Sequence, residues 1–152
     1  MKIKTKYFGE VDIEDELILS FEEGIFGFED NKSFVIVYNN KTEASPFCWL
    51  QSTDDSAVCL PLIDPLAFFP EYNPEIPGDR VAKIGELKEE DLKLFTVVVV
   101  PEEIKRMTTN LMAPILVNVK TKKGLQVVVA DEEYEIRHNL YEQIMQMKEA
   151  TE

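Results

Sequence analysis

The segment FCWLQSTDD, residues 47–55, gathers residue types that could perform nucleophilic chemistry. Cys48 could act as a nucleophile if a histidine activated its thiol. His138 is the single histidine of the sequence, and no residue pattern that would orient a catalytic pair accompanies it. Strand alternation places Cys48 on the opposite face from Phe47 and Trp49, without deciding which face is buried. A structural thiol and a lone structural histidine are therefore favoured, and we expect no catalytic residues.

Patterns that could bind a metal or a phosphate are incomplete. Two cysteines and one histidine cannot fill a four-ligand zinc site without carboxylates, and no acidic group follows the D-x-[DN]-x-[DN]-G pattern of a calcium loop. Gly24 and Gly27 in EEGIFGFED lack the Lys-Ser/Thr pair of a phosphate-binding loop. We therefore predict no metal site and no cofactor. Instead, both glycines should allow positive φ in a tight connection anchored by Ile25, Phe26 and Phe28.

The charge of the chain limits the class of partner that it can bind. The formal net charge is −13 over 152 residues, with a pI of about 4.5. This balance argues against direct binding to nucleic acid or to an anionic membrane, because phosphate contacts need clustered Lys and Arg. It suits a basic protein partner, which the negative field would steer toward the chain. Solubility alone would also explain the acidity.

The N-terminal sequence and the apolar runs indicate where the protein works. Residues 1–21 contain neither an apolar signal core nor a small-residue cleavage site. The longest apolar run, residues 95–101, is far too short to cross a membrane. We therefore expect a cytoplasmic protein in which Cys48 and Cys59 are reduced and buried.

Short β-branched and aromatic runs dominate the sequence and predict strands. These runs cover residues 3–8, 17–21, 33–38, 47–50, 57–62, 95–100, 115–119, 126–129 and, alternating more weakly, 134–138. Helix is predicted in three places: a turn that Asp64 caps, a turn or two within residues 88–93, and the C-terminus, where Leu140, Ile144 and Met147 recur at helical spacing. The last helix is expected to pack on its own domain more readily than on a partner.

Many short strands in one chain favour a closed or nearly closed sheet, because closure removes exposed strand edges. The sequence therefore predicts a mostly β, single-domain, small antiparallel β-barrel-like fold over residues 1–138, with one or two short helices. Residues 139–152 are predicted to form an amphipathic C-terminal helix or a frayed tail of the same domain.

Two segments have the composition of a binding surface. In DPLAFFPEYNPEIP, residues 64–77, three aromatic side chains lie among four prolines, so a stiff loop carries them. The segment MTTNLMAPILVN, residues 107–118, begins a strand, and because Pro114 is tolerated only at a strand edge, start or bulge, an exposed edge is favoured. The alternatives are a loop folded over one barrel mouth and side chains that fill a core. The predicted partner contacts are Phe68, Phe69, Tyr72, Met107, Asn110 and Leu111.

Other residues are assigned to the scaffold. Residues 47–50 are expected to form a core strand, with Trp49 among the large side chains that fill the barrel, and residues 51–55 its polar end and turn. Because buried amides need hydrogen-bond partners, we expect Gln51 to pair with backbone near Gln126 or Asn118.

Five segments together resemble the flagellar assembly factor FliW family. In order along the chain they are FEEGIFGFED, PFCWLQSTDD, DPLAFFPEY, TTNLMAPILVN and LQVVVADEEYEIRH, and they span nearly all of it. Two positions depart from the family: Phe26 stands where proline is usual, and Met112 lies where the family varies. Phe26 would change the rigidity of its loop, and neither departure undermines the resemblance.

The resemblance implies a regulatory binding protein with a β-barrel-like fold, and not an enzyme. It implies two alternative protein partners in the cytoplasm: flagellin before its export, and the translational repressor CsrA, which blocks translation of flagellin mRNA. Accumulated flagellin would occupy the factor and free the repressor. Export of flagellin would let the factor capture the repressor, so that flagellin synthesis resumes.

Two other classes of function are weighed against this one. A small-molecule carrier would need an open barrel lumen, which large side chains would fill. An enzyme would need Cys48, His138 and a third polar group to converge in one pocket.

Overall fold

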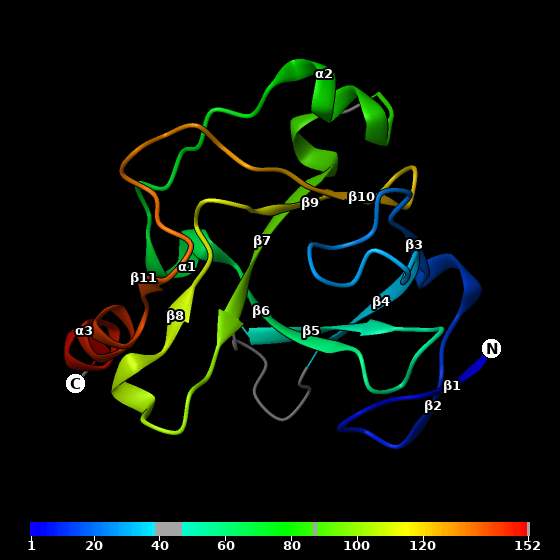
Figure 1. Cartoon of the computed structure of the whole chain (residues 1–152), viewed down its shortest axis with the longest axis horizontal. Coiled ribbons are helices and arrows are strands. Elements are labelled where there is room, and N and C mark those ends of the chain that lie inside the picture. The colour runs from blue at the N-terminus through cyan, green and yellow to red at the C-terminus, as the bar shows by residue number, and fades with distance from the viewer. Residues whose placement is uncertain (39–46, 87, 152) are drawn as a thin grey trace.

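The computed structural model of the chain describes residues 1–38, 47–86 and 88–151, apart from the side chains of Glu89 and residues 147–151. Strands dominate the described residues, and short helices lie at their periphery (Figure 1). The strands are β1 (Lys2–Lys4), β2 (Glu10–Asp12), β3 (Leu19–Ser20), β4 (Ser33–Tyr38), β5 (Phe47–Ser52), β6 (Cys59–Ile63), β7 (Leu92–Val99), β8 (Thr108–Thr109), β9 (Ile115–Asn118), β10 (Lys123–Gln126) and β11 (His138–Asn139). The α-helices are α1 (Pro65–Phe68), α2 (Gly78–Val81) and α3 (Tyr141–Thr151), and the 3₁₀ turns are η1 (Asp15–Leu17), η2 (Ala82–Ile84), η3 (Glu89–Asp91) and η4 (Ile104–Arg106).

Seven strands close into a barrel in the order β7-β6-β5-β4-β3-β10-β9, and β9 pairs again with β7. All of these pairings are antiparallel except that of β3 with β10, which is parallel and joins Ser20 to Lys123. Beyond the barrel, β8 pairs with the end of β7, and β11 pairs with β8. The prediction of a mostly β, barrel-like domain with few short helices and a C-terminal helix is therefore confirmed.

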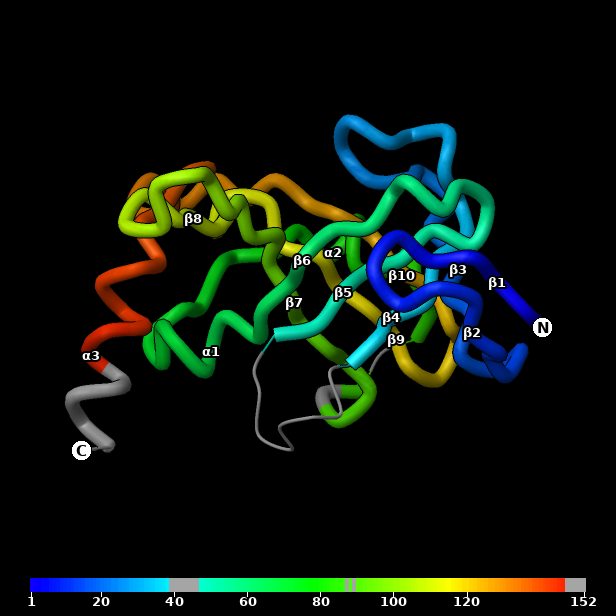
Figure 2. Tube along the Cα trace, turned by 90° about the horizontal axis from the view of Figure 1, so that it is seen from below, coloured from blue at the N-terminus to red at the C-terminus, as the bar shows by residue number. Residues whose placement is uncertain are grey.

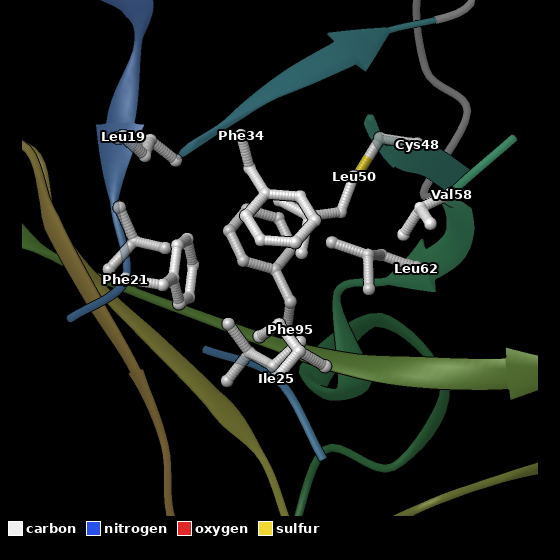
Figure 3. Close-up of a cluster of buried hydrophobic side chains, with 11 residues drawn as sticks. Leu19, Phe21, Ile25, Phe34, Cys48, Leu50, Val58, Leu62 and Phe95 are labelled. Atoms are coloured by element: carbon white, nitrogen blue, oxygen red, sulfur yellow. The ribbon is translucent and has the colours of Figure 1, made fainter. Parts of the chain in front are cut away.

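Apolar side chains fill the centre of the barrel. Strand alternation turns every second residue inward, and the inward set packs into one cluster, in which the rings of Phe21 and Phe34 meet edge to face with centroids 5.4 Å apart (Figure 3). The buried members are Leu19, Phe21, Ile25, Phe34, Cys48, Leu50, Val58, Leu62, Phe95, Ile115 and Val117. Trp49 is not among them: it faces outward, half-buried, with its ring 5.4 Å from that of Phe8. The prediction that Trp49 fills the barrel is wrong, because Cys48 and Leu50 take the inward positions.

Two further apolar clusters lie outside the barrel wall. One joins α1 and α3 to the outer side of β6 and β7, and its buried members are Ile63, Phe68, Val98, Met107 and Leu140. The other packs η2 against β9 and β10 through Ile84, Leu116, Leu125 and Val127. Helix α3 therefore lies on the domain itself, through Tyr141 and Ile144, at the opposite end of the molecule from the β1–β2 hairpin (Figures 1 and 2).

The glycine loop before β4 turns as its sequence requires. Gly24 and Gly27 have φ values of +71° and +88°, a region that side chains with a Cβ rarely adopt. Ile25 is buried, but Phe26 and Phe28 are 49% and 36% exposed. The expectation that Phe26 and Phe28 anchor this loop is therefore wrong. Backbone bonds close the loop instead, as when the N–H of Phe28 donates to the carbonyl of Ile25 at 2.7 Å.

Proline and asparagine explain where the observed strands depart from the predicted ones. The strand predicted over residues 126–129 is instead β10, which ends at Gln126. The N–H of Val127 still donates to the carbonyl of Pro114, but Pro114 has no N–H to return, so the regular ladder stops there. The segment at residues 107–118 breaks into β8 and β9 because the Oδ1 atom of Asn110 accepts the N–H groups of Met112 and Ala113. Each of these strands pairs on both sides, so this segment is not an exposed edge.

Candidate functional site

Four of the six predicted partner contacts line one hollow on the surface. This aromatic hollow has a volume of about 520 Å³ and lies between α1, the loop that follows it, and the segment that leads into α3. Its lining consists of Phe68, Phe69, Pro70, Glu71, Tyr72, Leu111, Glu133, Tyr134, His138 and Gln143. Met107 lines a different depression, and the side chain of Asn110 closes a backbone turn.

Helix α1 positions the first wall of the aromatic hollow. The Oδ1 atom of Asp64 accepts the N–H of Leu66 at 3.0 Å, and Pro65 occupies the first turn, so the helix starts as the sequence predicts. The short helix directs Phe68 into the core, where its ring lies 5.7 Å from that of Phe47. Phe69 follows at the C-cap, and its ring meets His138 edge to face at 5.2 Å.

A pair of tyrosines ties the second wall to the first. The hydroxyl of Tyr72 donates to the carbonyl of Leu111 at 2.6 Å, and its ring lies 4.6 Å from that of Tyr134. The hydroxyl of Tyr134 accepts the N–H of Asn73 at 2.9 Å. Burial raises the pKa of Tyr72 well above its ordinary value, and the neighbouring Tyr134 and Asp131 raise it further. Tyr72 therefore remains a neutral donor that holds the two loops together.

The predicted contacts differ in what they can offer a partner. Four of the side chains are at least nine-tenths buried, namely Phe68, Tyr72, Met107 and Leu111. Phe69 and Asn110 are half-buried. Phe68, Tyr72 and Leu111 consequently shape the floor of the aromatic hollow, and the role of all six residues in partner binding stays a prediction.

A second concave surface was not predicted from the sequence. Strands β6 and β7 pair only at Leu62–Val97 and Ile63–Thr96, and they separate beyond these residues. The space between them, which we call the strand groove, has a volume of about 750 Å³. Its lining consists of Lys6, Tyr7, Phe28, Phe47, Cys48, Trp49, Cys59, Leu60, Pro61, residues 97–100 and Met107. Tyr7, Val99 and Val100 are each more than half exposed, so the groove is an apolar surface open to solvent.

Cys48 and His138 do not converge. Cys48 belongs to the cluster inside the barrel, where Figure 3 shows its sulfur among the core side chains. His138 lies in β11, at the aromatic hollow, with a buried Nδ1 atom that has no hydrogen-bond partner among the described residues. Across the described part of the chain, no group of three or more His, Cys, Asp and Glu side chains could hold a metal ion. The barrel centre, which is filled, counts against a small-molecule carrier.

Burial makes both thiols poor nucleophiles. It raises the pKa of Cys48 to about 12 and that of Cys59 to about 11, from an ordinary value of 9.0. At pH 8 we therefore expect a disulfide reagent such as DTNB to label the folded protein at least 100-fold more slowly than the denatured chain, with Cys59 reacting before Cys48. The variants C48A and C59A assign the two rates. Rapid labelling of either thiol in the folded protein would contradict this burial.

The same shifts set a pH dependence of stability. Because both thiols have higher pKa values in the folded protein than in the unfolded chain, the unfolded chain ionises first as pH rises. The free energy of unfolding should be insensitive to these groups well below pH 9 and should fall from about pH 9 to about pH 11 through Cys59, and to about pH 12 through Cys48.

Three buried amides belong to the scaffold, each with its own partners. Gln51 accepts the N–H of Lys6 and donates to carbonyls including that of Ser52. Gln126 accepts the N–H of Phe26 and donates to the carbonyl of Ala113. Gln51 therefore pairs with the N-terminal segment and its own turn, and the expectation that it pairs near Gln126 or Asn118 is wrong.

Asn118 closes the β9–β10 turn and fastens it to η2. Its Oδ1 atom accepts the N–H groups of Lys120 and Thr121, and its amide donates to the carbonyls of Ile84 and Glu86. All of its bonds are thus to the backbone, as befits a buried amide that stabilises irregular chain.

Comparison with known proteins matches more than nine-tenths of the chain to one family. The family model described as FliW protein matches residues 2–140. The flagellar assembly factor FliW of Lachnoclostridium phytofermentans is 43% identical over 143 residues, which cover 93% of this chain and 92% of that protein. The protein of the same name from Thermotoga maritima is 40% identical, with 97% and 98% covered. A crystal structure of the flagellar assembly factor FliW superposes with a TM-score of 0.83 at 33% identity, covering 93% of this chain and 97% of the other.

No helix among the described residues is both long enough and apolar enough to cross a membrane.

Proposed function

The chain belongs to the FliW protein family, and from this premise we propose that it is a flagellar assembly factor that acts by binding proteins. Its two clients are flagellin before export and the translational repressor CsrA. The observation that carries the proposal is the family match, which extends over residues 2–140 and includes the strand groove and all of the aromatic hollow except Gln143. The protein works in the cytoplasm, where both clients occur, and contacts neither nucleic acid nor membrane directly.

The strand groove is the surface we assign to flagellin. Unassembled flagellin ends are amphipathic helical segments, and such segments bind by laying an apolar face into an apolar groove. Tyr7, Val99 and Val100 line the groove and offer exposed apolar surface for that face. Among the described residues that line the groove, Lys6 is the only charged one, so a bound apolar segment would remove few charged groups from solvent.

The acidic surface is the feature we assign to the repressor. An RNA-binding repressor presents basic residues, and this chain carries a formal charge of −13. Docking would bring carboxylates close to the RNA path and weaken RNA binding through repulsion between like charges. Such repulsion acts over roughly 8 Å at physiological salt. The antagonism should therefore fade as salt rises, and equal inhibition from low to high salt would indicate steric or conformational antagonism instead.

A competition experiment tests the proposed function. The complex with CsrA is formed first, flagellin is titrated, and the free repressor is followed through its binding to a labelled fragment of flagellin mRNA. We expect flagellin to release the repressor and RNA binding to return. If neither purified client binds the protein in low-salt buffer, the proposed function is wrong.

A further inference from the structure

We infer that the aromatic hollow is a receptor for an arginine side chain on the surface of a basic protein client. The inference rests on the proposed function, since it assigns the chemistry by which such a client is held. It is carried by two features of the lining: aromatic rings, and carboxylates that form no ion pair with the described residues.

The rings come from segments that are far apart in the sequence. Phe69 and Tyr72 come from the end of α1 and the loop after it, Tyr134 comes from the segment before β11, and the rings of Tyr72 and Tyr134 lie 4.6 Å apart. Hydrogen bonds from Tyr72 to Leu111 and from Asn73 to Tyr134 fix both tyrosines. A cation gains energy over the face of an aromatic ring, and it gains more where water is excluded. A rigid aromatic hollow is therefore prepared for a cationic group.

The charges in the lining have the sign that a cation needs. Glu71 and Glu133 line the hollow, and among the described residues neither forms an ion pair. Asp131 lies close by, because its Oδ1 atom accepts the N–H of Glu75 and its charge acts on Tyr72. No Lys or Arg is among the described residues that line the hollow. The hollow thus offers negative charge that the described residues do not neutralise.

Arginine satisfies both features better than lysine does. Its planar guanidinium can stack on a ring and at the same time donate two parallel hydrogen bonds to one carboxylate. A lysine ammonium is a more strongly hydrated point charge and would lose more on leaving water. The two glutamates repel anions, and a purely apolar side chain could not form an ion pair with them.

The first experiment measures the affinity of the basic repressor by isothermal titration calorimetry at low salt. The double variant E71Q/E133Q removes both rim charges, and the matched control E10Q/E132Q removes two exposed carboxylates outside the hollow. We expect the first variant to bind roughly tenfold more weakly than the control. Thermal unfolding of both variants should match that of the unaltered protein, because all four side chains are exposed.

The second experiment tests the hollow without the repressor. The probe is the peptide acetyl-Ala-Arg-Ala-amide, compared with the same peptide carrying citrulline, a neutral group of the same shape. In NMR titrations of the full chain, the arginine peptide should shift the amide signals of Glu71, Tyr134 and His138 with saturation, and the citrulline peptide should not.

The outcomes separate the inference from the proposed function. If the repressor binds but E71Q/E133Q loses no more affinity than the control, the inference is overturned and the proposed function stands. If the repressor does not bind the unaltered protein, the proposed function fails and the peptide titration decides the inference. Equal shifts with arginine and citrulline peptides would overturn it in either case.

Discussion

Replacing Gly124 with alanine is expected to lower the free energy of unfolding by about 3 kcal/mol. A Cβ atom at this position in β10 would lie 2.3 Å from the ring of Phe21, a distance at which one of the two groups must move. Phe21 is fully buried and packed against Phe34 inside the closed barrel. The ring has no free volume into which to move, because protein cores are close-packed. Chemical denaturation followed by circular dichroism measures the loss.

Two other variants serve as controls for G124A. Gly78 begins α2 in open space, so G78A should change stability by less than about 1 kcal/mol, and in the stabilising direction. The double variant G124A/F21L should recover part of the loss, because the smaller side chain makes room for the new methyl group. If G124A were as stable as G78A, the close packing of Phe21 against Gly124 of β10 would be refuted.

Placing two negative charges in the strand groove is expected to weaken flagellin binding by about 100-fold. Val99 and Val100 line the groove and are 55% and 57% exposed, so V99E/V100E should leave folding intact. A bound apolar segment would bury both carboxylates beside a single described cation, Lys6, and a buried charge that is not fully compensated is costly. Fluorescence anisotropy with a labelled peptide from the flagellin end gives the affinity.

The matched control for this variant is V128E/I136E. Val128 and Ile136 are as exposed as the two groove valines, at 55% and 60%, and they lie outside the strand groove. This control should bind flagellin as the unaltered protein does, with a similar melting temperature. Equal losses in both variants would show that net charge, and not the groove, governs flagellin binding.

Local sequence signals predicted the elements whose causes are local. β4 spans residues 33–38 as expected, because alternating β-branched and aromatic residues fit a half-buried strand. Asp64 and Pro65 likewise predict the start of α1, because Asp caps a helix N-terminus and Pro fits its first turn. The hairpin strand β2 is not predicted, since two of its three residues, Glu10 and Asp12, are depleted in strands and its turn depends on Gly9 at φ +67°.

The residues that form the two concave surfaces are brought together by contacts between segments far apart in the sequence, so local sequence signals do not predict these surfaces. The sequence indicates six candidate contacts in two segments, but not which of them meet: Phe68 and Phe69 pack against the cluster that contains α3, whereas Tyr72 contacts Tyr134. The strand groove was not found because it arises where β6 and β7 stop pairing. The one sequence signal for the groove is the unbroken apolar run at residues 97–100. Where such a run continues past the last residue paired with the neighbouring strand, its apolar side chains are left exposed. Alternation likewise fixes the faces of Cys48 and Trp49 relative to each other, and not which one lies inside.

The parallel pairing of Ser20 with Lys123 bears on how the chain is made. It joins a strand near the beginning of the sequence to one near its end, so the barrel cannot close while the ribosome still holds β10 in its exit tunnel. Until then the nascent β3–β6 meander has an uncovered edge at β3, which is the kind of edge that recruits other strands. A chain truncated before Lys123 should accordingly aggregate, whereas a chain in which β10 has left the exit tunnel can close the barrel.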